Sequence, residues 1–379
     1  MESFSWSDWS RSRGYLFPSD NLGAPPSSMK LHTLRLPGSI VGNHHHPCSS
    51  QRAVFLFLFL FLFLFLFLFL LLLLLFSAGC AQQLRTIAFL PRDTADDLWE
   101  PAHKGAMNAA RGSGFRVYWN GPTRPDDFQR QILLLDRAIR RGDQGIVIAP
   151  GQSLALMTPV LRAISAGLPT VVLGSPLPMP AAGTLSYVLN DEEEEGRIAA
   201  ARLCERLHGR GSIAVLGVDP STPGLVHRLH AFQTAIHGQC HDVEIVAVRM
   251  GSEDAGQAEH AAQEVLVSQP QLNAIFAISG AATSGAFRAL RDGHKSQQVL
   301  LVGCDQQYGQ LYYLSQGAID SIIAQNTYEM ADHAIKMIIA QTNGQGMPHL
   351  VFVKPVLLTH DNLYEPQFAP LLTYWRSVP

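Results

Sequence analysis

The residues Thr86–Ala110, TIAFLPRDTADDLWEPAHKGAMNAA, decide the fold of this chain. They begin with an apolar run, Ile87–Leu90, which has the length of one buried strand. A polar loop, Arg92–Trp99, leads into small and apolar residues that recur at spacings of three and four, as on one face of a helix. Asp96 or Asp97 is placed to cap that helix and to complement its dipole. The stretch therefore predicts strand, loop and helix. Ligands of open parallel sheets bind outside the carboxyl ends of the strands, so we expect a first binding site in this loop.

The same alternation continues along the chain. Apolar runs of strand length are separated by longer segments with helical periodicity. Strands that alternate with helices of this length are typical of parallel βαβ crossovers, and this many strands exceed one compact sheet. We therefore predict an α/β protein with two doubly wound parallel-sheet lobes. The predicted strands are Thr86–Leu90, Phe115–Trp119, Gly145–Ala149, Thr170–Leu173, Tyr187–Leu189, Ile213–Leu216, Val243–Val248, Ala274–Ile278, Val299–Val302 and Ser321–Ala324.

The bulk composition excludes some classes of function. The formal net charge of the 379 residues is −3, which gives no electrostatic case for a nucleic-acid partner. The sequence has no nucleophile elbow, no phosphate-binding P-loop and no zinc-protease motif. We expect a protein that is not an enzyme, with no catalytic residues, no cofactor and no metal.

The cysteines are Cys48, Cys80, Cys204, Cys240 and Cys304, and they form neither a CxxC pair nor a metal-ligand spacing. We expect Cys204 and Cys304 to be buried thiols. A disulfide between Cys204 and Cys240 is the alternative if the compartment is oxidising.

The segment Ala53–Phe76 is an uninterrupted run of 24 apolar residues, long enough as a helix to cross a bilayer. The small residues Ser77-Ala78-Gly79 and then Cys80 follow it. This order resembles the bacterial lipobox, where signal peptidase cuts before a cysteine that becomes lipidated, although Ser77 stands where that motif usually has leucine. Residues 53–80 are therefore a lipoprotein signal with lipidation at Cys80, an ordinary cleaved signal, or an uncleaved membrane anchor. Each alternative places the rest of the chain outside the cytoplasm, in the periplasm or at the cell surface.

Residues 1–52 are rich in Ser, Pro, Arg and His and have no periodicity, so we expect them to be disordered or absent from the mature protein. Translation from Met29 rather than Met1 would give the apolar segment a charged leader containing Lys30 and Arg35.

Taken in order, the motifs from Arg85 to Asn362 resemble those of type I periplasmic binding proteins, nearest to the ribose-binding-like receptors of sugar ABC transporters. No single motif is specific, and the resemblance lies in their order and spacing. The motifs are TIAFLP (86–91), QGIVIAPGQS (144–153), AGLPTVVLGS (166–175), HRLHAFQTAI (227–236), NAIFAISGAATSGAFRAL (273–290), VLLVGCD (299–305) and IIAQN (322–326).

The resemblance implies two lobes that are joined by a three-segment hinge and clamp a small polar ligand. It places residues 85–189 plus 326–349 in the first lobe and 190–325 plus 350–362 in the second, with 363–379 as a tail. The implied function is that of a monomeric, lipid-anchored receptor that delivers a sugar-like molecule to an ABC permease. The alternatives are a ligand-sensing ectodomain that signals to a membrane partner, and a LacI-type regulator lacking its DNA-binding domain.

The resemblance also implies which residues contact the ligand. Asp305 would accept hydrogen bonds from two hydroxyls, Gln325 would supply a hinge amide, and Trp99 would stack on the sugar ring. Each has a structural alternative, namely a helix cap, hinge backbone contacts and core packing. The full set of implied contacts is Asp96, Trp99, Asn190, Arg228, Ser279, Asp305 and Gln325.

The chain departs from the family pattern at several of these positions. Gly174 and Ser175 stand where an Asp–Arg pair is common, and Val226 stands where an arginine is expected, which leaves Arg228 in a structural role. Ser279 replaces an asparagine. We therefore expect either a less hydroxylated or differently shaped ligand, or replacement contacts from Arg92, Asp93, Tyr187, Asn190 and His227.

Overall fold

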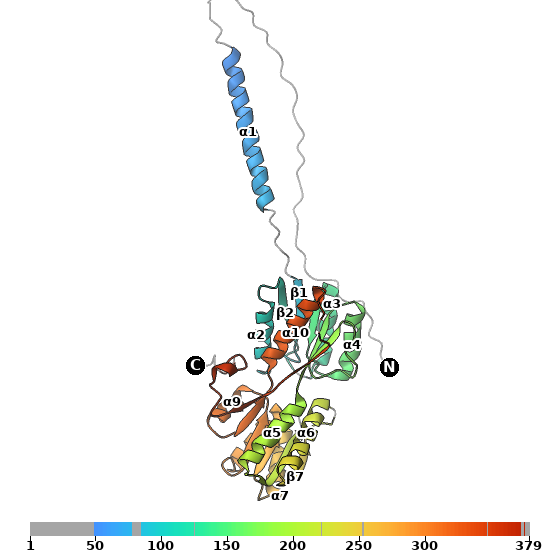
Figure 1. Ribbon diagram of the computed structural model, residues 1–379, viewed down its shortest axis with the longest axis vertical. Coiled ribbons are helices and arrows are strands. Elements are labelled where there is room, and N and C mark those ends of the chain that lie inside the picture. Colours follow the sequence, from blue (N-terminus) through green and yellow to red (C-terminus); the bar gives the residue numbers. More distant parts are fainter. Residues whose placement is uncertain are drawn as a thin grey trace, which may run out of the picture. The chain divides into compact units, whose positions relative to one another are not determined.

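We describe a computed structural model of the chain, which covers residues 49–77, 85–124, 126–220, 222–251, 254–346, 348–372 and 375. It divides into two compact units, Met1–Gly79 and Cys80–Pro379. The described part of the first unit is one helix, α1 (Ser49–Ser77; Figure 1). Within it Ala53–Leu71 has a mean hydropathy of 3.4 and is unburied, so it is long and apolar enough to cross a membrane. The predictions for residues 1–48 and for the lipidation site Cys80 lie outside the described residues.

The second unit contains two sheets, each covered by helices on both faces. In the first sheet the strands follow the order β11-β5-β4-β3-β1-β2, and every pair is parallel. Its strands are β1 (Arg85–Leu90), β2 (Phe115–Trp119), β3 (Gly145–Ile148), β4 (Thr170–Gly174), β5 (Leu185–Asn190) and β11 (Leu350–Val353). Helices α2 (Trp99–Ala110) and α10 (Thr327–Thr342) pack on one face, and α3 (Phe128–Arg141) and α4 (Ser153–Ser165) pack on the other (Figure 1).

The second sheet follows the order β12-β10-β9-β8-β6-β7, in which β12 runs antiparallel to β10. Its strands are β6 (Arg210–Val218), β7 (Asp242–Met250), β8 (Ala274–Ala277), β9 (Leu300–Cys304), β10 (Ser321–Ala324) and β12 (Val356–Thr359). Helices α5 (Glu192–Arg206) and α6 (Pro223–Gln239) cover one face, and α7 (Ala255–Ser268) and α8 (Gly280–Asp292) cover the other. The short helix α9 (Tyr308–Ser315) follows β9, and a 3₁₀ turn, η1, spans Pro366–Phe368.

This layering explains why the strands are uninterrupted apolar runs. β3, β8 and β10 are buried at every position, because helices cover both faces of each sheet. Local signals set the helix ends: Asp127 caps α3 by accepting from the Arg130 amide at 3.0 Å, and Gly142 ends that helix at a φ of +74°.

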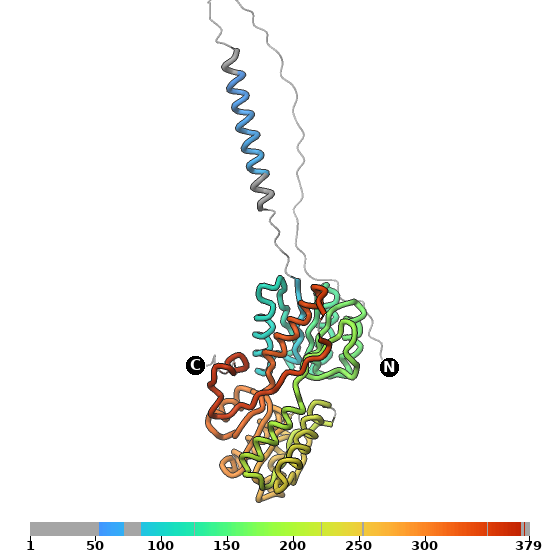
Figure 2. The backbone as a smooth tube through the Cα atoms, viewed as in Figure 1, coloured from blue at the N-terminus to red at the C-terminus, as the bar shows by residue number. Residues whose placement is uncertain are grey.

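The chain passes between the two sheets at three places, after β5, after β10 and between β11 and β12 (Figure 2). The third crossing shows that one predicted lobe boundary is wrong. Residues 350–353 lie in the first lobe, because β11 pairs in parallel with β5, from Leu350 opposite Tyr187 to Val353 opposite Asn190. The described part of the segment 363–379 packs on the second lobe, where Leu363, Leu371 and Leu372 are buried.

The expectation for Cys204 as a free thiol is wrong. Cys204, on α5, forms a disulfide with Cys240, at the end of α6, so the bond joins the two helices on one face of the second sheet. Cys304, the last residue of β9, is a buried free thiol as predicted, and burial raises its pKa.

Candidate functional site

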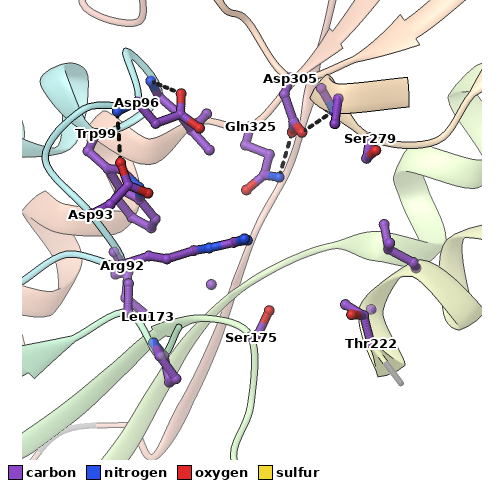
Figure 3. Close-up of a pocket in the computed structure, with 18 of the residues that line it drawn as sticks. Arg92, Asp93, Asp96, Trp99, Leu173, Ser175, Thr222, Ser279, Asp305 and Gln325 are labelled. Atoms are coloured by element: carbon purple, nitrogen blue, oxygen red, sulfur yellow. Dashed lines mark hydrogen bonds between the residues drawn. The ribbon is translucent and has the colours of Figure 1, made fainter. Parts of the chain in front are cut away.

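A cavity of about 320 Å³ lies between the two lobes. Its walls are the loops at the carboxyl ends of the strands of both sheets, as expected for parallel α/β sheets. The polar residues that line it are Arg92, Asp93, Asp96 and Ser175 from the first lobe, and Glu192, Thr222, Arg228, Ser279, Asp305, Gln307 and Gln325 from the second lobe and the hinge (Figure 3).

Aspartates shape the first loop. The buried Asp93 accepts through Oδ1 from the amides of Ala95 at 3.0 Å and Asp96 at 2.8 Å. Asp96 in turn accepts from the Leu98 amide at 3.0 Å. Helix α2 has no side-chain cap, so the expectation that Asp96 or Asp97 caps it is wrong. Asp97 instead accepts through Oδ2 from the Tyr308 amide of the other lobe at 3.3 Å.

Asp96 lies in an environment that disfavours its charged form. The pKa of its carboxyl is raised to about 6, mainly by burial and also by the nearby carboxylates of Asp305 and Asp93, while the Leu98 amide and Arg92 act in the opposite direction. In Figure 3 the Asp96 and Asp305 side chains come from different lobes, and the Arg92 side chain extends into the cavity.

Asp305 joins the second lobe to the hinge. Its backbone has a φ of +67°, in the left-handed region. Oδ2 accepts from the Gly280 amide at the start of α8, and Oδ1 accepts from Nε2 of Gln325, both at 2.8 Å (Figure 3). Asp305 does not cap the helix that follows it. The N-cap position of α9 is Gln307, and no side chain makes a capping hydrogen bond there.

Gln306, a residue that sequence reasoning missed, binds the backbone of Gln325 and leaves the Gln325 side chain available for its contact with Asp305. Gln306 donates through Nε2 to the Gln325 carbonyl at 2.8 Å and accepts from the Gln325 amide at 3.1 Å. The buried Gln306 thus satisfies the hinge backbone, and the side chain of Gln325 faces the cavity. Since Gln306 follows Asp305 directly, its position after the carboxyl end of β9 was the available signal.

Trp99 lines the cavity and also belongs to the core. It is the first residue of α2, its side chain is 8% exposed, and it packs in the cluster that joins α2 and α10 to the first sheet. Ser279 lines the opposite wall, where its Oγ caps α8 by accepting from the Ala282 amide at 3.2 Å.

Arg228 reaches the cavity wall, but its guanidinium is held by protein groups. Nε donates to Glu192 Oε2 at 2.9 Å, Nη1 donates to the Ile278 carbonyl at 2.6 Å, and Nη2 lies 2.6 Å from Glu195 Oε2. Burial opposes the charge of Arg228, yet these two carboxylates raise its pKa well above the ordinary value. Burial likewise raises the pKa of Glu195, against the effect of Arg228. This arrangement supports the structural role expected for Arg228.

The structure does not bring Asn190 into this cavity. Asn190 is 2% exposed and donates through Nδ2 to Glu195 Oε1 at 2.5 Å. Of the suggested replacement contacts, Arg92 and Asp93 line the cavity. Tyr187 instead donates its hydroxyl to the Met179 carbonyl at 2.7 Å. Glu192, Thr222 and Gln307 line the cavity and were not predicted.

The arrangement can bind a small polar molecule. Carboxylates and amides converge from both lobes beside one large aromatic side chain, which is the combination that holds a polar ring with an apolar face. Among the described residues, no group of three or more His, Cys, Asp or Glu side chains is placed to hold a metal ion.

The sequence of residues 87–346, more than half of the 379-residue chain, matches the family model described as the periplasmic binding protein domain. The chain belongs to the periplasmic binding protein family. Membership confirms the predicted fold class and the expectation that the chain is not an enzyme, and it implies a periplasmic location.

Curated relatives and a solved structure support the same family assignment. The chain is 25% identical over 269 residues to the D-allose-binding periplasmic protein of Escherichia coli, covering 69% of this chain and 86% of that protein. It is 23% identical over 272 residues to the D-ribose/D-allose-binding protein of Pseudomonas aeruginosa, covering 68% and 83%. The structure of AraP, an arabinose-binding protein from Geobacillus stearothermophilus, superposes with a TM-score of 0.69 at 25% identity, covering 74% of this chain and 98% of AraP.

Proposed function

We propose that this chain is an extracytoplasmic receptor that clamps a sugar-like small molecule and delivers it to an ABC permease. The observation that carries the proposal is the cavity of about 320 Å³, where Asp96 and Trp99 of the first lobe face Ser279, Asp305 and Gln325 of the second lobe and hinge. The volume lies in the range of small-molecule sites, and two relatives are named for binding D-allose and D-ribose.

The proposed mechanism is closure of the two lobes on the ligand. Gln325 Nε2 donates to Asp305 Oδ1 at 2.8 Å, so a ligand hydroxyl that binds the carboxylate is linked through it to the hinge. Contacts to both lobes are complete when the lobes are closed, so the ligand shifts the open–closed equilibrium toward the closed state. The family resemblance favours a monomer for this role.

A binding screen tests the proposal. The full chain would be purified in a detergent without a sugar headgroup, and its thermal unfolding would be followed with sugars, polyols, nucleosides and amino acids. A ligand that binds the native state raises the apparent stability by RT ln(1 + [L]/Kd), so a true ligand at 100 times its Kd stabilises by about 2.7 kcal/mol. Stabilisation by amino acids alone, with no response to sugars or polyols, would contradict the sugar assignment.

We also propose that Cys80 is lipidated after cleavage, which anchors the receptor to the membrane. The support is the apolar helix α1 and the small residues before the cysteine. In a bacterium that processes lipoproteins, the chain should incorporate labelled fatty acid, and Cys80→Ala should abolish the label. Cys48→Ala, which changes a cysteine on the other side of the apolar segment, is the matched control. Equal labelling of the Cys80→Ala chain would exclude this site.

A further inference from the structure

A second cavity, of about 450 Å³, adjoins the ligand cavity. The two cavities share three wall residues, Gly174, Glu192 and Gly224. These residues come from both lobes, since Gly174 ends β4, while Glu192 and Gly224 lie at the starts of α5 and α6.

Little side-chain volume separates the two cavities at this junction. Two of the three shared residues are glycines, and a Cβ built on Gly174 would meet no atom within 4 Å. Gly174 and Ser175 are also the positions where the family resemblance would place a bulky Asp–Arg pair. The third shared residue, Glu192, accepts from Arg228 Nε at 2.9 Å, and its side chain lies against Gly224, where a built Cβ would come within 2.9 Å of Glu192 Oε1.

One wall of the second cavity is apolar and includes an aromatic side chain that the fold leaves exposed. Phe352, on the hinge-side strand β11, is 57% exposed, although an aromatic side chain gains free energy by burial. It lines this cavity together with Pro176 and Leu189. An exposed aromatic beside a sugar site is suited to stacking against a ring, because it offers a flat apolar face.

Polar groups complete the second cavity. Asn190 lines it, is 2% exposed, and has an Oδ1 without a hydrogen-bond donor in the part of the chain that the structure describes. His227 lines the opposite lobe's side of the cavity. Asn190, an implied ligand contact, and His227, a suggested replacement contact, do not line the first cavity, and both line the second.

We propose that the two cavities form one elongated site and that the ligand is a glycoside, with its sugar ring at Asp305 and Trp99 and a second ring against Phe352. The inference rests on the proposed function, because it takes the first cavity as the sugar site. The linkage between the two rings passes the junction beside Gly174, where a built Cβ would meet no atom within 4 Å.

Calorimetry with matched ligands and variants tests this proposal on the full chain. The probes are D-allose, D-ribose and D-arabinose, each as the free sugar, the methyl glycoside and the phenyl glycoside. The variant is Phe352→Ala, and Leu350→Ala is its control, because Leu350 lies two residues away on the same strand, is 47% exposed and does not line the cavity.

For the sugar that binds, the phenyl glycoside should bind about three- to tenfold more tightly than the methyl glycoside. Phe352→Ala should remove this difference, and Leu350→Ala should preserve it. Equal affinity for both glycosides, exclusion of the phenyl glycoside, or an unchanged preference in Phe352→Ala would each overturn the elongated site while the free sugar still binds. Failure of every free sugar and glycoside to bind would instead count against the sugar-receptor function.

Discussion

Replacement of Asp305 separates its structural role from its expected role in binding. In the structure its carboxylate accepts two hydrogen bonds of 2.8 Å, from the Gly280 amide and from Gln325 Nε2. A hydrogen bond to a charged group contributes about 1.5–3 kcal/mol, but part of this is recovered when water replaces the partner at a cleft. We therefore expect removal of the carboxylate to lower the free energy of unfolding by about 2–4 kcal/mol.

The backbone of Asp305 makes the choice of substitution informative. Its φ is +67°, a conformation that glycine adopts freely, that asparagine and aspartate tolerate, and that costs alanine about 1–2 kcal/mol. Asp305→Gly should therefore be more stable than Asp305→Ala by about 1 kcal/mol, although both lack the carboxylate. Asp305→Asn keeps one acceptor oxygen and the tolerated backbone, so it should be the most stable of the three.

Binding should follow a different order from stability. A sugar hydroxyl that loses its charged acceptor should bind about ten- to a hundredfold more weakly, at 1.4 kcal/mol for each factor of ten. We expect this loss in Asp305→Gly and Asp305→Ala alike, because neither supplies an acceptor. The measurements are urea unfolding followed by circular dichroism and titration calorimetry with the sugar that binds. Near-wild-type affinity in Asp305→Gly would refute the ligand role and leave Asp305 as a link between α8 and the hinge.

Two further predictions concern the first lobe. The raised pKa of Asp96, about 6 against 3.8, means that the folded state binds more protons than the unfolded state between these values. The stability of the ligand-free protein should therefore fall as pH rises from about 4 to 6, by at most about 3 kcal/mol at 1.36 kcal/mol per pH unit, and Asp96→Asn should flatten this part of the stability–pH curve. An unchanged curve in Asp96→Asn would assign the pH dependence to other groups. Trp99 is 8% exposed within the first-lobe core, so Trp99→Ala should destabilise by about 3–5 kcal/mol as well as weaken sugar binding, whereas Trp99→Phe should retain most of the stability. A Trp99→Ala protein as stable as the wild type would show that the indole contributes only to the cleft.

Much of the fold could be predicted because its signals are local. The buried strands of parallel sheets are continuous apolar runs, and the helices between them repeat their apolar residues every three or four positions. β11 was assigned to the wrong lobe because its four residues, LVFV, carry no information about their partner. That partner is β5, more than a hundred residues earlier in the chain.

Part of the candidate site could be predicted for a related reason. The family resemblance implied Asp96, Asp305 and Gln325, and these residues line the cavity because they follow the carboxyl ends of strands, which parallel strands bring to one edge of each sheet. The same rule did not predict the position of the Asn190 side chain. Asn190 also ends a strand, but its side chain donates to Glu195 and lines the neighbouring cavity.

The sequence by itself therefore determined the element types, the two α/β lobes and the strand ends that line the cavity, since periodicity and strand polarity are properties of short segments. The tertiary structure alone decided which side chains meet. Asp305 bonds a residue 25 positions away, Arg228 bonds Glu192 36 positions away, and Cys204 pairs with Cys240 across two helices. These partners depend on how separate segments pack, and hydrogen bonds and disulfides require atoms within a few ångströms, which no local pattern specifies.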